Sequence, residues 1–297
     1  MFFREVFHMR EEITGHTVLT ALLGSPVAHS ISPMMHNESF RLLGLDYAYL
    51  AFDVDLDHLK IAVEGLKTMN CRGFNCTMPH KTLVCEYVDH MSDAAKLIGA
   101  VNTVVNDNGV LTGHNTDGIG YMQSVKAAGF DIIGKTMTLF GVGGAATAIL
   151  AQAALDGVKN IHVFNRKSAS FDKAIPFIDK LNRETNCNVT LYDLADETML
   201  RNCLQESHIL TNGTSVGMAP NTDATILTDT SMFHEDLIVS DVIYNPEETL
   251  LMKQAKSAGC RTFNGLYMLL YQGAEAFKIW TGKEMPVEII KKKYFDR

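Results

Sequence analysis

The 297-residue chain lacks any apolar run of the roughly 18 residues that a membrane-spanning helix requires. Its opening stretch, MFFREVFHMREEITGH, places charges where a signal peptide needs an apolar centre. It also lacks internal repeats, low-complexity tracts and flexible linkers. We therefore expect a cytoplasmic protein with no membrane partner.

Basic residues are in the minority, because 26 Lys and Arg face 34 Asp and Glu for a formal net charge of −8. This balance argues against nucleic acid as the main partner. It leaves room for an anionic small molecule, which needs only a local positive site.

Metal-binding cysteine patterns are also missing. The six cysteines, at positions 71, 76, 85, 187, 203 and 260, form no CxxC pair, and none of the three closest has a histidine at zinc-finger spacing. We expect free, mostly buried thiols and neither a metal site nor a disulfide framework.

Alternating strands and helices make up the first part of the chain. Strands are expected at residues 17–24, 47–54 and 72–76, with a helix over 56–68. Another helix is expected over 32–44, with Ser32 as its cap and Pro33 at its first position. Residues 99–118 predict two short strands around an Asn-Gly turn at 108–109.

The second part predicts a six-stranded, doubly wound Rossmann domain. MTLFGVGGAATAILAQAALDG contains a strand, a glycine turn and an apolar helix, and further strands are expected at 161–165, 188–193, 208–213, 237–243 and 260–265. The length indicates two domains. We expect an N-terminal α/β domain over 1–113, completed by a returning helix within 266–297, and the Rossmann domain over 114–265.

The glycine turn FGVGGAA follows the GxGxxG/A pattern of dinucleotide-binding sites. Gly141 permits the tight turn, Gly143 lets backbone amides approach a pyrophosphate, and Ala146 lets the helix pack close to the strand. The amino end of that helix supplies free N–H groups for phosphates. Glycines also serve ordinary turns, but here the pattern lies between a strand and a helix, which favours a cofactor site.

The next strand ends in FNRK, where an NAD site usually presents an acidic residue to the ribose. Asn165 can still bond a ribose hydroxyl, and Arg166 can stack on adenine or pair with a 2′-phosphate. With Lys167 beside them, these residues favour NADP or the use of both cofactors, without forbidding NAD. A solvated basic loop is the alternative.

Four polar clusters fall at predicted strand ends or helix starts: GSPVAHSISPMMHN (24–37), NCTMPHK (75–81), GAVNT (99–103) and GHNTDGIG (113–120). Each alone could be structural; Asp117, for example, could simply cap a helix. Ligands of open α/β sheets lie outside the carboxyl ends of strands, so we expect the clusters to gather at one edge. Their hydroxyls and amides suit a polyhydroxylated ligand. Lys81 and Asp117 suit proton transfer, with His80 and His114 as rival bases.

These motifs, in this order, resemble the shikimate dehydrogenase family from about residue 22 to 281. Within it, NRK…SFDKA, TNGTSVGM, IYNP and MLLYQGAEAFKIWTGK are most similar to the quinate/shikimate dehydrogenase branch. The resemblance implies reversible NAD- or NADP-dependent hydride transfer between shikimate and 3-dehydroshikimate, and between quinate and 3-dehydroquinate. The implied setting is aromatic amino acid biosynthesis or quinate use, in a monomer or homodimer.

The resemblance also implies site residues by position. Lys81 would be the catalytic lysine and Asp117 its partner. Substrate contacts would come from Ser30, Ser32, Thr77, Asn102, Tyr244 and Gln272. Cofactor contacts would come from Gly141, Gly143, Gly144, Ala145, Ala146, Asn165, Arg166, Lys167, Thr214, Ser215, Val242, Tyr244 and Gly265.

Three positions depart from the family pattern. Ser168 stands where the dual-cofactor branch can carry aspartate, Ser215 where lysine can occur, and Tyr267 where glycine is usual. The sequence leaves three questions open: whether quinate or shikimate is preferred, whether NAD or NADP is preferred, and whether Lys81 is a true base or mainly orients the substrate. A catalytically silent NAD(P)-binding regulator, or a dehydrogenase for an aminated shikimate analogue, are the competing interpretations.

Overall fold

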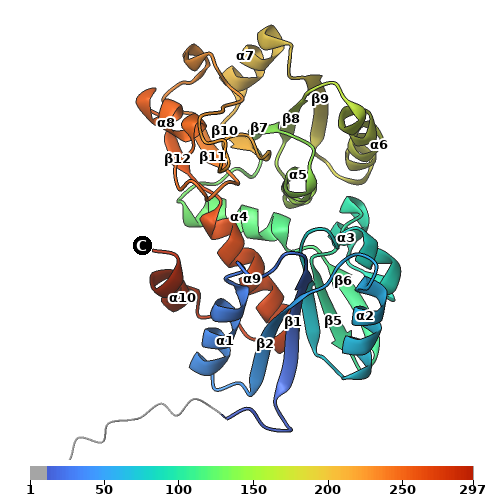
Figure 1. Ribbon diagram of the computed structural model, residues 1–297. Coiled ribbons are helices and arrows are strands. Elements are labelled where there is room, and N and C mark those ends of the chain that lie inside the picture. The colour runs from blue at the N-terminus through green and yellow to red at the C-terminus, as the bar shows by residue number, and fades with distance from the viewer. Residues whose placement is uncertain (1–11, 297) are drawn as a thin grey trace, which may run out of the picture. The chain divides into compact units, whose positions relative to one another are not determined.

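The computed structural model describes residues 12–296, which divide into two compact units (Figure 1). Unit 1 contains residues 12–90, Val101–Gly113 and 276–296, and unit 2 contains Met91–Ala100 and His114–Glu275. Along the described part of the chain, no helix has the length and apolar character that spanning a bilayer demands. The opening stretch lies mostly outside the described residues, so the expectation of no signal peptide stays a prediction.

Unit 1 is built on a six-stranded mixed sheet with the strand order β2-β1-β3-β5-β6-β4. Its strands are β1 (Val18–Gly24), β2 (Tyr47–Asp53), β3 (Gly73–Cys76), β4 (His90–Met91), β5 (Thr103–Asp107) and β6 (Val110–His114). Its helices are α1 (Ser32–Leu42), α2 (Leu59–Thr68), η1 (Leu83–Tyr87) and α10 (Val287–Tyr294). Strand β1 pairs in parallel with β2 and β3, whereas β5 runs antiparallel to β3.

Two local expectations for unit 1 have clear outcomes. Asn108 and Gly109 both have positive φ, 55° and 90°, as a two-residue hairpin turn requires, so the predicted Asn-Gly turn is confirmed. The expected cap of the helix at 32–44 is wrong: Ile31 occupies the N-cap position, and Ser32 is the first helical residue. The Ser32 side chain is thereby available for a contact outside the helix.

The aromatic core of unit 1 is completed by a segment from near the end of the chain. Trp280 is buried, its Nε1 donates to the Val104 carbonyl at 3.0 Å, and its own carbonyl accepts from Arg72 Nε at 2.9 Å. His36 stacks on Tyr49 with ring centroids 4.5 Å apart. Without a Cβ, Gly73 lets the Trp280 ring approach its backbone, since an added Cβ would lie 2.3 Å from Nε1.

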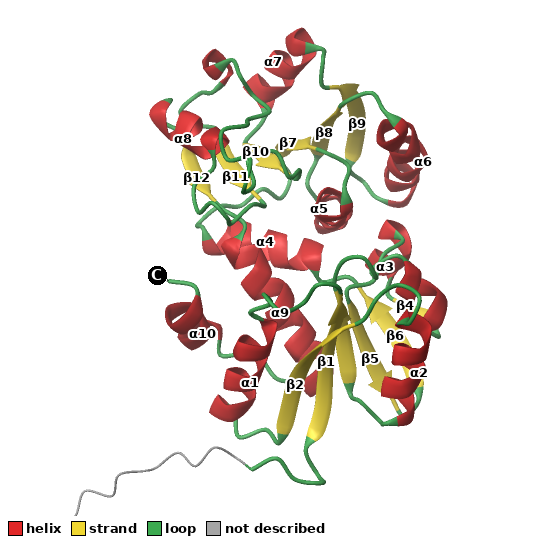
Figure 2. Ribbon diagram, viewed as in Figure 1, coloured by secondary structure: helices red, strands yellow, loops and turns green. Residues whose placement is uncertain are grey.

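Unit 2 is a doubly wound sheet of six parallel strands in the order β12-β11-β10-β7-β8-β9, which confirms the predicted Rossmann fold (Figure 2). The strands are β7 (Thr136–Phe140), β8 (Asn160–Asn165), β9 (Asn188–Asp193), β10 (Ile209–Asn212), β11 (Ile238–Asp241) and β12 (Arg261–Phe263). The helices are α3 (Asp93–Ile98), α4 (Asp117–Ala127), α5 (Gly144–Asp156), α6 (Ala169–Glu184), α7 (Glu197–Glu206), η2 (Thr230–Met232), α8 (Leu250–Ser257) and α9 (Leu266–Thr281).

The two faces of the unit 2 sheet carry separate apolar cores. One packs α4, α5 and α6 against the sheet and includes Ile161 and Val163 of β8. The other packs α7 and α8 on the opposite face and includes Phe164 of the same strand. Figure 1 shows α5 and α6 on one side of these strands and α7 and α8 on the other. Strands buried on both faces explain the continuous apolar runs in this half of the sequence.

The compact units differ from the expected domain boundaries in two places. Residues 91–100 belong with unit 2 because α3 contacts α5 and α6. Residues 266–275 also belong with unit 2, because the start of α9 packs on α4 at Gly120, where an added Cβ would lie 2.6 Å from the Gln272 nitrogen. Helix α9 therefore begins in one unit and ends in the other.

Candidate active site

A hydrogen-bonded polar network joins β2, the end of β3 and the start of β5 in unit 1. Tyr49 on β2 donates from its hydroxyl to Asn75 Oδ1 at 2.8 Å, and Asn75 Nδ2 donates to the Asn102 carbonyl and to Thr103 Oγ1. The Thr103 hydroxyl donates in turn to Asn102 Oδ1 at 3.0 Å. Burial raises the pKa of Tyr49 well above its ordinary value, so its hydroxyl stays protonated and can donate.

The serine loop joins this network at one end. The Ser32 side chain shares a hydrogen bond with the Tyr49 hydroxyl, and the Ser32 backbone nitrogen donates to Ser30 Oγ at 3.2 Å. Ser32 is nearly buried, whereas Ser30 is half-buried. The structure therefore brings Ser30, Ser32 and Asn102 into one connected group, as expected, and adds Tyr49, which the sequence gave no reason to choose.

The turn carrying Lys81 is pinned by backbone hydrogen bonds on both sides. Thr77 N donates to the Leu23 carbonyl, His80 N to the Thr77 carbonyl, and Val101 N to the Lys81 carbonyl at 2.7 Å. Burial raises the pKa of Cys76, and the positive charge of Lys81 partly offsets that rise, which places the ammonium near the end of β3. The half-buried Lys81 therefore stands beside the polar network on a fixed turn.

Two buried histidines of unit 1, His80 and His36, have structural surroundings. His80 is fully buried and its Nε2 lies 2.7 Å from the Val54 carbonyl. His36 is also fully buried, and burial lowers its pKa to about 3, so it stays neutral at physiological pH. His80 is therefore poorly placed as a base in place of Lys81.

The glycine turn of unit 2 has the backbone that its sequence predicts. Gly141 follows β7 with φ at 96°, a conformation that side chains rarely adopt, and Gly143 is the N-cap of α5. Atoms added as Cβ to Gly143 or Gly144 would meet nothing in residues 12–296 within 4 Å. The amino end of α5 therefore has open space in front of it, which fits a pyrophosphate group.

Close packing behind the turn depends on a second glycine. A Cβ on Gly213 would lie 2.7 Å from the Cβ of Ala146 and 3.0 Å from the Phe140 carbonyl oxygen. Ala146 is fully buried. Ala146 thus packs closely against Gly213, in the loop after β10, a partner that the sequence analysis missed.

Hydrogen bonds within the FNRK loop and the residues that follow it fix the loop's conformation. Asn165 Nδ2 donates to the Arg166 carbonyl at 3.0 Å and to Ser170 Oγ at 3.2 Å, and Ser168 and Ser170 share a hydroxyl contact of 2.9 Å. Arg166 and Lys167 are exposed at the start of α6. Exposed cations and hydroxyls at a helix amino end suit a phosphate group.

A buried carboxylate organises the other candidate cofactor loops. Asp241, at the end of β11, accepts from Asn212 Nδ2 with both oxygens, from Thr249 Oγ1 at 2.8 Å and from Ile243 N at 3.0 Å. Asn212 in turn accepts from the Thr214 hydroxyl at 2.7 Å. Burial raises the pKa of Asp241 to about 6, although the three donors act in the opposite direction.

This carboxylate holds together loops that carry Thr214, Ser215, Val242 and Tyr244. Val242 N donates to the Asn212 carbonyl at 3.0 Å, and Gly265 N donates to the Ile243 carbonyl at 3.1 Å. A Cβ on Gly265 would lie only 1.9 Å from the Val242 oxygen. Ser215 and Tyr244 are exposed beside them, so the structure gathers these candidates at the carboxyl edge of the sheet.

Asp117 and Gln272 lie on neighbouring helices of unit 2. Asp117 is the first residue of α4, behind the N-cap Thr116, and its nitrogen donates to Asn115 Oδ1 at 3.2 Å. Gly118 permits close packing on α5, and Gly120 permits close packing on α9 beside Gln272. Lys81 belongs to unit 1, so its pairing with Asp117 is a proposal taken up below.

Two family models match the chain. The shikimate dehydrogenase substrate binding domain matches residues 22–104, and the shikimate 5′-dehydrogenase C-terminal domain matches residues 265–293. The first covers Ser30, Ser32, Lys81 and Asn102, and the second covers the helix that carries Gln272.

Curated relatives and a solved structure extend the similarity over almost the whole chain. A shikimate dehydrogenase (NADP⁺) of Listeria innocua is 55% identical over 285 residues, which are 96% of this chain and 98% of the relative. A quinate/shikimate dehydrogenase of Escherichia coli is 49% identical over 280 residues, covering 94% and 97%.

The solved structure is a shikimate 5-dehydrogenase of Listeria monocytogenes in complex with shikimate and NAD. It has a TM-score of 0.93 at 55% identity and covers 96% of this chain and 99% of its own. Identity of this degree along both units, together with the two matching models, shows that the chain belongs to the shikimate dehydrogenase family.

Proposed function

We propose that this chain is an NAD(P)-dependent dehydrogenase that interconverts shikimate and 3-dehydroshikimate and also oxidises quinate. The observation that carries the proposal is the polar network that joins β2, β3 and β5 of unit 1, in the segment that matches the substrate binding domain model. The 55% identity to a relative named as a shikimate dehydrogenase (NADP⁺) supports the same activity.

The unit 1 network suits a small carboxylate bearing several hydroxyls. The serine hydroxyls of residues 30 and 32 would donate to the substrate carboxylate, and Thr77 and the amide of Asn102 would meet ring hydroxyls. The polar groups of Tyr49 and Asn75 form hydrogen bonds with each other and with the residues beside them. These two side chains therefore hold Ser32 and Asn102 in place. Such preorganisation lowers the entropy lost on binding.

Lys81 would carry the proton in this reaction. As the alcohol carbon is oxidised, its hydroxyl must lose a proton, and an amine on a rigid turn beside the substrate hydroxyls can accept it. Asp117 would orient Lys81 and share a hydrogen bond with the substrate. In the reverse direction the lysine would donate the proton.

The residues present fit a dinucleotide. The open space in front of Gly143 and Gly144 and the free amides of α5 fit a pyrophosphate, with Ala145 on the same turn. When bound, NAD or NADP supplies the hydride acceptor of the oxidation. Asn165, Arg166 and Lys167 would clamp the adenosine ribose, and Thr214, Ser215, Val242, Tyr244 and Gly265 would border the nicotinamide. We propose that both cofactors are accepted, with NADP preferred.

Quinate use is the finer part of the proposal. Shikimate and quinate share a carboxylate and ring hydroxyls, and differ at the ring carbon that bears the carboxylate. The 49% identity to the E. coli quinate/shikimate dehydrogenase supports acceptance of both. We also propose that the protein acts in the cytoplasm as a monomer or homodimer, which sedimentation of the purified chain would test.

Steady-state kinetics with the four pairs of substrate and cofactor test the proposal. We expect formation of reduced cofactor with shikimate and either cofactor, and slower formation with quinate. Turnover of shikimate alone would remove quinate from the proposal. If neither substrate is turned over, while the cofactor still binds in a calorimeter, the chain is a silent NAD(P)-binding regulator or acts on a different substrate, such as an aminated analogue.

A further inference from the structure

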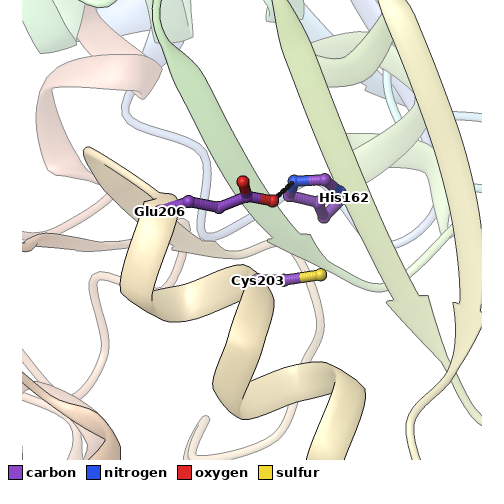
Figure 3. Close-up of side chains that lie close together, drawn as sticks. All are labelled: His162, Cys203 and Glu206. Carbon is purple, nitrogen blue, oxygen red and sulfur yellow. Dashed lines mark ion pairs between the residues drawn. The ribbon is translucent and has the colours of Figure 1, made fainter.

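Three side chains with metal-binding atoms converge on unit 2, away from the candidate cofactor loops. They are His162 from β8 and Cys203 and Glu206 from α7, and their ligand atoms all lie within 4.8 Å of one another. Figure 3 shows the imidazole, the thiol and the carboxylate pointing toward the same space between strand and helix. Cys203 and Glu206 are three positions apart and so share one face of the helix.

The histidine of this cluster is buried and contacts the carboxylate of the same cluster. His162 is only 8% exposed, and within residues 12–296 neither of its ring nitrogens has a hydrogen bond. Its Nε2 does lie 2.7 Å from Glu206 Oε1, but this contact lacks the geometry of a hydrogen bond. A metal ion at this point would replace the direct contact between Nε2 and Glu206 Oε1 and could bind both groups.

The donor set selects a class of metal. Imidazole, thiolate and carboxylate together are borderline ligands that suit Zn²⁺, with a water molecule in the fourth tetrahedral position. The usual Zn–N and Zn–S lengths place two such ligand atoms about 3.5 Å apart. Metal binding would therefore move the exposed Glu206 carboxylate slightly away from His162 Nε2, which it approaches to 2.7 Å.

The position separates this cluster from the proposed chemistry. His162 is near the start of β8, and Glu206 closes α7 just before β10 begins, so the cluster lies toward the amino edge of the sheet. The glycine turn and the Asp241 loops lie at the carboxyl edge. The rings of Tyr192 and His162 are 5.8 Å apart, so an aromatic wall borders the cluster.

We propose that His162, Cys203 and Glu206 form a zinc-type metal site that links α7 to β8. The site would take no part in the dehydrogenase reaction. A bound metal would stabilise unit 2 by joining a helix to the strand beneath it. The cysteine spacings that argued against a metal site do not bear on this arrangement, because the histidine comes from a strand 41 positions before the cysteine (162 against 203).

Cobalt titration of the full-length protein, stripped with a chelator and kept under a phosphine reductant, tests the site. We expect one Co²⁺ per chain, with the visible absorption of a tetrahedral ion and a thiolate charge-transfer band, displaced by one equivalent of Zn²⁺. Zn²⁺ should raise the melting temperature, since it binds only the folded arrangement. Absence of any Co²⁺ spectrum at several equivalents would overturn the proposal.

Variants assign the ligands. Cys203→Ser should abolish the charge-transfer band. Glu206→Gln changes an exposed side chain and should weaken Zn²⁺ binding about tenfold or more. Cys187→Ser and Glu197→Gln are the matched controls, a buried cysteine in the same unit and an exposed glutamate on the same helix, and both should bind like the wild type. Equal binding by Glu206→Gln and wild type would refute the assignment.

Discussion

The two sheets of this chain end in different chemistry. In unit 1, strand ends carry side chains with hydroxyl, amide and amine groups, and Tyr49 and Asn75 fix them through hydrogen bonds. In unit 2, the strand ends carry glycines that bring backbone into close approach, and the buried Asp241 holds the loops together. The first arrangement would offer a ligand mainly side chains, and the second would offer mainly backbone.

This difference predicts which substitutions each unit tolerates. Deleting a side chain should damage unit 1 most, because a group that touches the substrate is lost while the fold persists. Adding a single methyl group should damage unit 2 most, because its glycines have no room. The predictions below test this contrast, beginning with the largest expected effect.

Replacing the Lys81 amine should affect turnover far more than stability. We expect Lys81→Ala to lower kcat for shikimate oxidation by about 10²–10⁴-fold, the usual contribution of a general acid–base group, with an unchanged melting temperature. Lys60→Ala is the control, since Lys60 is an exposed lysine in the same unit. A kcat reduced less than about tenfold would assign proton transfer to another group.

A methyl group at Gly265 should destabilise unit 2. The added Cβ would lie 1.9 Å from the Val242 carbonyl oxygen, so Gly265→Ala must move backbone at the end of β11, and we expect a loss of about 1–3 kcal/mol in the free energy of unfolding. Chemical denaturation without cofactor measures it. Gly144→Ala has open space around its Cβ and should unfold like the wild type; equal losses in both variants would contradict the argument.

The buried Asp241 should make stability depend on pH in a defined direction. Its folded pKa of about 6 lies above the value near 4 of an unfolded aspartate, so the folded state holds the proton more tightly. Wild type should therefore gain about 1.4 kcal/mol relative to Asp241→Asn when the pH falls from about 7.5 to about 5.

Denaturation of both proteins at the two pH values measures this gain. Asp236→Asn, at an exposed position, should show no such pH-dependent difference from wild type. If the stability of wild type relative to that of Asp241→Asn stays constant or falls as the pH falls, the folded state does not raise the pKa of Asp241.

The smallest expected effect concerns cofactor choice at the exposed FNRK loop. Arg166→Ala should reduce the ratio of kcat/KM for NADP to that for NAD by roughly two- to fivefold, because an exposed ion pair with a 2′-phosphate is worth little. Lys173→Ala, at an exposed lysine on the helix α6 that follows the loop, is the control. An unchanged ratio would remove Arg166 from cofactor discrimination.

The Rossmann unit could be predicted from the sequence because its signals are local. A few neighbouring residues are enough to identify the glycine turn, the apolar helix after it and each short buried strand. All six strands occur where expected. The Asn108-Gly109 turn is local in the same sense. The prediction of Ser32 as the N-cap was wrong. A proline fits the first or the second helical position, so Pro33 does not by itself fix the residue at which the helix begins.

The residues that hold the site together could not be predicted, because their partners are distant in sequence. Tyr49 reaches Asn75 across β1, which lies between β2 and β3, so the pairing exists only once the sheet order is known. Asp241 looked like an ordinary position in an apolar strand, and only its burial beside Asn212 and Thr249 reveals its role. The convergence of His162 with α7 depends on the fold in the same way.

The return of the chain to unit 1 has a consequence for how this protein is made. The ribosome releases the whole of unit 2 before Trp280, whose indole fills the core beside β3 and β5. Until Trp280 has been synthesised, the core of the N-terminal sheet lacks this side chain. All residues of unit 2 are already present at that point. We therefore expect chaperones to bind the nascent N-terminal sheet in preference to the nucleotide-binding unit.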